Sequence, residues 1–215
     1  MTAAQKAAMQ NLWPAYGLDS QVPFRAEAAF QRNAPLIVEI GFGNGCNLAE
    51  NADQNPDINY LGIEVHEPGI GHLMKALADR QIRNVRIFRG DATEILRNLV
   101  EDESIDRINL FFPDPWPKKR HQKRRLVSPE FVELINRKLK TGGCFHAATD
   151  WQDYANQIAR NLTACGNLNE ISNTRAGLKR RAERCMTRFE ERGIALGHPV
   201  RDILFEKHGP DTTRT

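Results

Sequence analysis

Five short apolar segments, separated by stretches of helical composition, constrain the fold of this chain more than any other feature. The segments are residues 36–40, 60–65, 85–88, 108–112 and 144–148. Each is almost wholly apolar, as expected of a strand that is buried on both faces. Helical composition marks residues 47–53, 68–80, 92–100 and 128–139 between them. This alternation predicts an α/β fold, in which a parallel sheet carries helices on both faces.

The rest of the chain extends this pattern. A helix is expected over residues 151–163, a weaker strand over 168–172, a charged helix over 179–192 and a last strand over 200–206, which makes seven strands in all. Residues 1–33 read as an Ala-rich, helix-prone lead-in that Pro14 and Pro23 break. No repeat or linker divides the remainder, so we expect one domain over residues 34–208 and a disordered tail over 209–215.

Several classes of protein do not fit the composition. No apolar stretch approaches the roughly 20 residues that a membrane helix needs, and the first ten residues lack the pattern of a signal peptide. The four cysteines are far apart and form no CxxC pair, which favours reduced thiols over a zinc site or disulfides; they are Cys46, Cys144, Cys165 and Cys185. We therefore expect a cytoplasmic protein with no metal.

Acidic residues follow the predicted strands in step. Glu39 lies at the end of the first strand and Glu64 at the end of the second, while Asp91 and Asp114 come just after the third and fourth. In an open parallel sheet, ligands bind beyond the carboxyl ends of the strands. A buried acid is costly unless it is paired or faces a ligand. Four acids in step therefore indicate a binding site.

A glycine-rich turn follows the first strand, with Gly41, Gly43 and Gly45 at alternate positions. Glycine allows a sharp turn and a close approach of a ligand to the backbone. The spacing is not the GxGxxG of dinucleotide-binding folds, because Cys46 stands at the position of the third glycine. Glu64 suits a ribose diol, Asp91 an adenine amino group, and Glu39 a cation rather than a pyrophosphate. These features favour S-adenosylmethionine over a nicotinamide dinucleotide.

The loop after the fourth strand is proline-rich and runs into a cluster of basic residues. Pro113, Pro115 and Pro117 stiffen the loop around Asp114 and Trp116. Residues 118–125 then carry six basic side chains and no acidic one; without them the net charge of +3 would become −3. A solvated charge run is the simple interpretation, but its place beside the predicted site favours a phosphate backbone as its partner.

These motifs together resemble the bacterial tRNA (guanine-N7)-methyltransferases. The matching segments are Val38-Glu39-Ile40-Gly41-Phe42-Gly43, Gly62-Ile63-Glu64-Val65, Gly90-Asp91-Ala92, Phe112-Pro113-Asp114-Pro115-Trp116-Pro117-Lys118, Thr149-Asp150-Trp151 and Thr187-Arg188-Phe189-Glu190. They occur in order over nearly the whole chain, and the segment rich in proline is the most specific.

The resemblance implies a class I, Rossmann-like methyltransferase fold and transfer of a methyl group from S-adenosylmethionine to N7 of a guanosine in the variable loop of tRNA. It implies Asp114 as the catalytic residue, and a cofactor site formed by Glu39, Gly41, Gly43, Gly45, Glu64, Asp91 and Asp114. Substrate-binding residues would be Lys118, Asp150, Thr187, Arg188, Phe189 and Glu190. RNA-binding residues would be Arg120, His121, Gln122, Lys123, Arg124 and Arg125. The expected partner is tRNA, with no obligatory protein partner, and the protein is expected to be a monomer or weak homodimer.

Some alternatives stay open at this point. The family usually carries a basic extension ahead of the Leu12-Trp13-Pro14 region, and this chain begins almost at that region, so we expect RNA binding from the N-terminal side to be absent or reduced. Asp150 fits a helix cap as well as a ligand. A nicotinamide dehydrogenase, a methyltransferase acting on an amino group of a base and a non-catalytic RNA-binding module are the rival functions.

Overall fold

A single seven-stranded sheet organises the molecule. The computed structural model describes residues 2–184 and 199–209. The strands are β1 (Leu36–Ile40), β2 (Asn59–Glu64), β3 (Val85–Arg89), β4 (Ile105–Phe111), β5 (Leu139–Thr149), β6 (Leu168–Glu170) and β7 (Arg201–Lys207). Their order across the sheet is β3-β2-β1-β4-β5-β7-β6. The first five pair in parallel and β7 runs antiparallel to both β5 and β6. The predicted fold class is confirmed.

The helices and the sheet enclose two apolar cores. The helices are α1 (Ala3–Tyr16), α2 (Ala26–Phe30), α3 (Cys46–Gln54), α4 (Glu67–Asp79), α5 (Ala92–Leu99), α6 (Pro129–Lys138), α7 (Gln152–Thr163) and α8 (Arg175–Ala182), with a 3-10 helix, η1 (Lys119–Arg124). Alternate side chains of a strand point to opposite faces. Leu36, Val38 and Ile40 accordingly pack with α5, α6 and α7 in one core, and Ile37 packs with α3 and α4 in the other.

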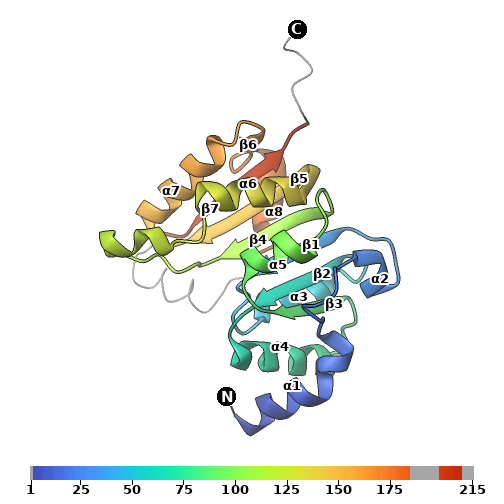
Figure 1. Ribbon diagram of the computed structural model, residues 1–215. Helices are drawn as coiled ribbons and strands as arrows, with labels where there is room; N and C mark the ends of the chain where they lie inside the picture. Colours follow the sequence, from blue (N-terminus) through green and yellow to red (C-terminus); the bar gives the residue numbers. More distant parts are fainter. Residues whose placement is uncertain (1, 185–198, 210–215) are drawn as a thin grey trace.

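The N-terminal lead-in lies against the sheet domain. Helix α1 packs along α4, and both lie beside β3, at the opposite end of the sheet from β6 (Figure 1). The prediction that Pro14 breaks this helix is wrong, because α1 continues through Pro14 to Tyr16. A proline inside a helix removes one backbone hydrogen bond and crowds the preceding turn. So close to the end of α1 that cost is limited, and Gly17 then closes the helix by donating its amide to the carbonyl of Trp13.

The observed bounds of some elements differ from the predicted ones. Strand β4 begins at Ile105 and β5 at Leu139, and these two residues pair across the sheet. The polar residues between Leu139 and Cys144 concealed this start, because backbone pairing does not require apolar side chains. Helix α8 begins at Arg175, earlier than predicted. The remainder of that predicted helix, from residue 185, and all of the predicted tail except Gly209 lie outside the described residues.

Candidate active site and nucleic-acid interface

The acids predicted from the sequence lie at the carboxyl ends of the parallel strands, which form one edge of the sheet. Because β3, β2, β1, β4 and β5 are parallel neighbours, their carboxyl ends meet there in the order Asp91, Glu64, Glu39, Asp114 and Asp150. Backbone hydrogen bonds join the adjacent ends of the strands. The amide of Gly90 donates to the carbonyl of Glu64 over 3.1 Å, and that of Phe112 donates to Ala148 over 2.7 Å.

Glu64 is fixed by backbone amides. One of its carboxylate oxygens accepts hydrogen bonds from the amides of Val65 and His66, at 2.7 and 2.9 Å. The other accepts from the amide of Gly43 at 2.8 Å. The side chain is buried and thus links the end of β2 to the glycine turn after β1. An ionised carboxylate has about four acceptor positions and the three amides use three of them, so the remaining position suits a ribose hydroxyl.

Glu39 is the most deeply buried of these acids. Its side chain accepts a 2.6 Å hydrogen bond from the side-chain amide of Asn47, at the start of α3. Burial raises the pKa of Glu39 to about 7, against the usual 4.5, although the bond from Asn47 opposes this rise. A buried carboxyl group held in this way would gain from a cationic partner, since an opposite charge nearby favours its ionised form.

Asp91 begins the helix that follows β3. It is the N-cap of α5, and one of its carboxylate oxygens accepts the amide of Glu94 at 3.0 Å. A carboxylate has two oxygens and the cap uses one of them. Asp91 is exposed at the edge of the sheet beyond β2. It therefore combines a structural role, which the sequence analysis did not name, with a position suited to ligand binding.

The glycine turn is shaped by its own backbone and by α4. Gly41, Gly43 and Gly45 have φ angles of 65°, 58° and 76°, which residues other than glycine rarely adopt. A β-carbon on Gly45 would lie 2.7 Å from the Leu73 side chain of α4. On Gly41 or Gly43 it would meet nothing within 4 Å, so the turn is open on that side and its backbone is accessible to a ligand.

The five acids have no basic partner among the residues that the structure describes. Among the described residues, no ion pair joins Glu39, Glu64, Asp91, Asp114 or Asp150 to a lysine or arginine. Two surface hollows, of about 380 and 280 Å³, lie elsewhere and involve none of these acids. Five acidic side chains therefore gather at these strand ends without a basic partner from the described residues, an arrangement that suits a cationic ligand.

The proline-rich loop after β4 holds two bulky residues in an unusual backbone conformation. Phe112 has a φ of 51° and Trp116 a φ of 43°, in the left-handed region that large side chains avoid. Such strained residues persist only where their surroundings hold them, and they are frequent in functional sites. Asp114 lies between them and is exposed, so a stiff loop presents its carboxylate at the edge of the sheet.

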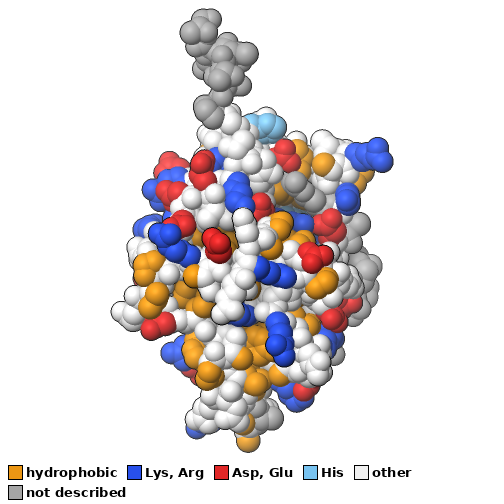
Figure 2. Space-filling view, turned by 90° about the vertical axis from the view of Figure 1, so that its right-hand side faces the viewer, with side chains coloured by type: hydrophobic (Ala, Val, Ile, Leu, Met, Phe, Trp, Pro, Cys, Tyr) orange, Lys and Arg blue, Asp and Glu red, His pale blue; other side chains and the backbone are white. Residues whose placement is uncertain are grey.

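The basic residues form a short 3-10 helix that packs on Trp116. The guanidinium of Arg124 lies 4.9 Å from the centre of the Trp116 ring, and the His121 ring meets the same ring edge-on at 5.9 Å. Within residues 118–125, the exposed basic side chains are Lys118, Lys119, Arg120, Lys123 and Arg124. On the side of the molecule shown in Figure 2, by contrast, acidic and basic side chains are interspersed. Positive charge is thus concentrated beside Asp114.

Arg125 is the exception among the predicted RNA-binding residues. Its side chain is only 1% exposed and forms an ion pair with Asp153 at 2.8 Å. It also donates to the carbonyl of Pro115 at 2.8 Å and to the side chain of Gln157 at 2.6 Å, and its guanidinium lies over the Tyr154 ring. Arg125 therefore anchors the basic helix to α7, and it is not part of the exposed basic surface.

The structure describes only part of the predicted substrate-binding set. Asp150 is exposed after β5, but it does not cap α7, because that helix begins at Gln152 and has no side-chain cap. The cap interpretation of Asp150 is therefore wrong. The four remaining substrate-binding residues, Thr187, Arg188, Phe189 and Glu190, lie outside the described residues.

The described residues contain no group of three or more histidine, cysteine, aspartate or glutamate side chains placed to hold a metal ion. None of the described helices is long and apolar enough to cross a membrane.

Comparison with known proteins decides the family. A family model described as "Putative methyltransferase" matches residues 33–203. The tRNA (guanine-N(7)-)-methyltransferase of Methylococcus capsulatus is 50% identical over 208 residues, which cover 96% of this chain and 90% of that protein. The protein of the same name from Nitrosococcus oceani is 48% identical, with coverages of 96% and 86%. The chain belongs to this family. The resemblance found in the motifs is confirmed.

Solved structures of more distant proteins agree on the fold. A 30S ribosomal A1408 methyltransferase from an uncultured bacterium matches with a TM-score of 0.60 at 15% identity, over 88% of this chain and 94% of that one. A phosphoethanolamine N-methyltransferase 2 from Haemonchus contortus, in complex with phosphomonomethylethanolamine and S-adenosylhomocysteine, matches with a TM-score of 0.53 at 13% identity, over 83% and 50% of the two chains. These likenesses support the class I methyltransferase fold.

Proposed function

We propose that the protein transfers the methyl group of S-adenosylmethionine to N7 of a guanosine in the variable loop of tRNA, in the cytoplasm. One observation carries the proposal: five acids at the carboxyl ends of parallel strands, none of them paired with a lysine or arginine in the described part of the chain, adjoin an exposed basic helix. The acids suit a small cation and the basic helix suits a polyanion. An enzyme that methylates RNA with a cationic methyl donor requires both features. The acids would bind the sulfonium and ammonium groups of the donor, and the basic helix would bind the RNA.

The residues on the β1, β2 and β3 side fit the cofactor. Glu64, held by three amides, would accept a hydrogen bond from a ribose hydroxyl at its remaining acceptor position, and Glu39 would take the ammonium group. Asp91 would accept a hydrogen bond from the adenine amino group. The open side of Gly41 and Gly43 lets the ligand reach the backbone. When bound, S-adenosylmethionine supplies an electrophilic methyl group, and no metal is needed for its transfer.

Asp114 is the proposed catalytic residue. Guanine N7 has a lone pair and carries no proton, so the attack needs no general base. As the methyl group is transferred, positive charge develops on the purine. The Asp114 carboxylate, presented by the stiff loop, would stabilise this charge electrostatically as it forms. Because the loop is rigid, little reorganisation accompanies the reaction.

The substrate is proposed to approach over η1. Lys119, Arg120, Lys123 and Arg124 are exposed and would contact phosphates, while Lys118, at the start of the helix, lies nearest the Asp114 loop. Asp150, exposed at the next strand end, would accept hydrogen bonds from the Watson–Crick edge of guanine. The target base must be unstacked, which is easier in a loop than in a duplex. The substrate-binding role of Thr187, Arg188, Phe189 and Glu190 stays a prediction, as does a monomeric or weakly dimeric state.

The test is methylation of tRNA by the purified protein. Unmodified tRNA is incubated with methyl-labelled S-adenosylmethionine and then cleaved by borohydride and aniline, which break the chain at N7-methylguanosine. We expect label in tRNA and one cleavage site, within the variable loop. Nucleoside mass analysis provides the control. Label on an exocyclic amino group would establish the rival methyltransferase instead, and donor binding without any transfer to tRNA would contradict the proposal.

A further inference from the structure

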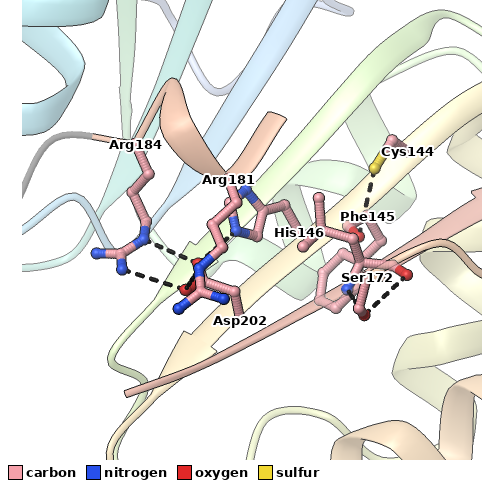
Figure 3. A network of polar contacts seen from close by, with 8 residues as sticks. Cys144, Phe145, His146, Ser172, Arg181, Arg184 and Asp202 are labelled. Carbon is pink, nitrogen blue, oxygen red and sulfur yellow. Dashed lines mark hydrogen bonds and ion pairs between the residues drawn. The ribbon is translucent and has the colours of Figure 1, made fainter. Parts of the chain in front are cut away.

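A buried ionic cluster lies behind the loop that carries Asp114. Its centre is Asp202 on β7, whose side chain is 1% exposed. Arg184, just beyond α8, donates to Asp202 over 3.0 and 3.4 Å, and Arg181 of α8 forms an ion pair with Asp202 at 3.1 Å. Nε2 of His146 on β5 lies 2.8 Å from the same carboxylate. Figure 3 shows the two arginines and the histidine converging on Asp202.

The charge state of the cluster follows from its contacts. Burial alone would raise the pKa of Asp202, but hydrogen bonds from His146 and Arg184, with the charge of Arg184, lower it. Burial lowers the pKa of His146. The cluster therefore contains an ionised carboxylate and a neutral imidazole that donates from Nε2, while the guanidinium of Arg184 is held in a fixed orientation.

The face of that guanidinium covers two phenyl rings. Its central carbon lies 5.6 Å from the Phe111 ring centre and 5.7 Å from the Phe112 ring centre. The His146 ring meets Phe111 edge-on at 5.0 Å. Phe111 ends β4 and Phe112 begins the proline-rich loop. The cluster thus touches the strand end from which the catalytic loop departs.

Phe112 needs such support. Its φ of 51° is costly for a bulky residue and persists only where the surroundings hold it. Its amide is fixed by the carbonyl of Ala148 at 2.7 Å, and its ring lies under Arg184. Asp114 lies two residues further on. Pro113, between the two, has a fixed φ, so a change in the backbone of Phe112 also moves Asp114. A tilt of Phe112 would therefore displace the Asp114 carboxylate.

We infer that Arg184 and Asp202 are positioning residues for Asp114. Asp202 orients the guanidinium of Arg184, and this guanidinium packs on the rings of Phe111 and Phe112. The packing fixes the backbone conformation of Phe112 and therefore the position of Asp114. This inference rests on the proposed function, because it concerns the residue that acts on the purine. Neither arginine nor Asp202 belongs to the predicted site, and Arg184 acts through the two rings rather than by touching the substrate.

Arg181 is a matched control. It binds the same carboxylate from one turn earlier in the chain, but its side chain is 53% exposed. Among the described residues, it forms no cation–π contact with either phenyl ring. A role in stability alone predicts that either variant lowers the free energy of unfolding and leaves the turnover of the folded enzyme unchanged, whereas a role in positioning Asp114 predicts that Arg184, and not Arg181, affects turnover.

The experiment compares Arg184→Lys with Arg181→Lys in steady-state methylation of tRNA. Lysine keeps the charge but loses the planar fork that pairs with Asp202 and stacks on the rings. We expect Arg184→Lys to lower kcat by about 10- to 100-fold while the Kd for S-adenosylmethionine changes less than about twofold. We expect Arg181→Lys to change kcat less than about twofold.

A double-mutant cycle separates positioning from general stability. In the Asp114→Asn background, Arg184→Lys should cost less than about threefold, because the group that it positions is already absent. Equal losses in both backgrounds, or equal effects of the two arginine variants, would overturn the inference. If Arg184→Lys unfolds at the assay temperature, Phe112→Leu replaces it in the same cycle, with the same expectations. An inactive wild-type protein would refute the proposed function, whereas an active wild type with a fully active Arg184→Lys would refute only this inference.

Discussion

The two sides of the site hold their charges in different ways. On the β1, β2 and β3 side, Glu39 and Glu64 are buried and hydrogen-bonded to Asn47 or to backbone amides. On the β4 and β5 side, Asp114 and Asp150 are exposed. Prolines and the contacts of Phe112 hold the loop that carries Asp114, and Arg125 holds the adjacent helix η1 against α7. A buried and preorganised site suits a small cofactor, and exposed charges on a stiff loop suit a macromolecule. Substitutions on the two sides should therefore change different quantities.

The largest effect is expected for Asp114→Asn. Loss of its negative charge removes the stabilisation of the positive purine, so kcat should fall by about 10²- to 10³-fold. The Kd for S-adenosylmethionine, measured by calorimetry, should stay nearly unchanged, because the cofactor contacts on the other side remain. Turnover equal to that of the wild type would remove Asp114 from the mechanism.

Glu64→Gln should show the opposite behaviour. The variant loses the charge that accepts the ribose hydroxyl, and hydrogen bonds to charged groups contribute about 1.5–3 kcal/mol. The Kd for S-adenosylmethionine should rise by about 10- to 100-fold, with kcat at saturating cofactor near the wild-type value. Glu67→Gln is the matched control, since Glu67 pairs with Arg89 at the surface and should leave the Kd unchanged. Equal Kd values for the two variants would contradict the assignment of Glu64.

Glu39 makes cofactor binding depend on pH. Its carboxyl group, with a pKa of about 7, must be ionised to pair with an ammonium group. Affinity for S-adenosylmethionine should therefore fall by about 25-fold as the pH is lowered from 7.5 to 5.5, and binding should release protons. In Glu39→Gln the affinity should be lower and should not vary with pH over this range. A pH-independent Kd in the wild type would contradict this role.

The same group predicts a change in stability. Because its pKa is raised in the folded state, the folded protein binds the proton more tightly than the unfolded chain. The free energy of unfolding should then decline as the pH rises from about 4.5 to about 7. Glu39→Gln removes this penalty and should be more stable than the wild type at pH 8 in thermal unfolding. A less stable variant at that pH would show that the Asn47 contact outweighs the buried charge.

The smallest effects distinguish Lys123 from Arg125. Lys123→Gln should leave the free energy of unfolding within about 0.5 kcal/mol and weaken tRNA binding a few-fold, with a salt dependence shallower by about one phosphate contact. Arg125→Gln should lower the free energy of unfolding by about 1–3 kcal/mol, because it leaves the carbonyl of Pro115 and the side chains on α7 without their partner. Chemical denaturation measures the free energy of unfolding and filter binding measures the affinity for tRNA. Equal stabilities of the two variants would contradict the structural role of Arg125.

The sequence was sufficient wherever a signal is local. The alternation of apolar runs with helical stretches predicted the order of the elements, because burial on both faces requires continuous apolar residues. The acids Glu39, Glu64, Asp91 and Asp114 were found from their places at strand ends, and parallel pairing necessarily brings those ends to one edge. The cluster of basic residues at 118–125 and the proline-rich loop were equally visible, since each is rich in one type of residue, although the 3-10 helix formed by the basic residues was not predicted.

What only the tertiary structure decided concerns partners that are distant in the chain. Arg125 looks like its basic neighbours, but its partners lie 10 to 32 residues away and bury it. His146 meets Asp202 across 56 residues, and Arg184 meets it across 18. A single charged residue in a strand or helix is compatible with solvent, a ligand or an ion pair, and the pattern of the sequence does not distinguish among them. The packing of β4, β5, β7 and α8 does, because a buried charge is stable only beside the group that compensates it.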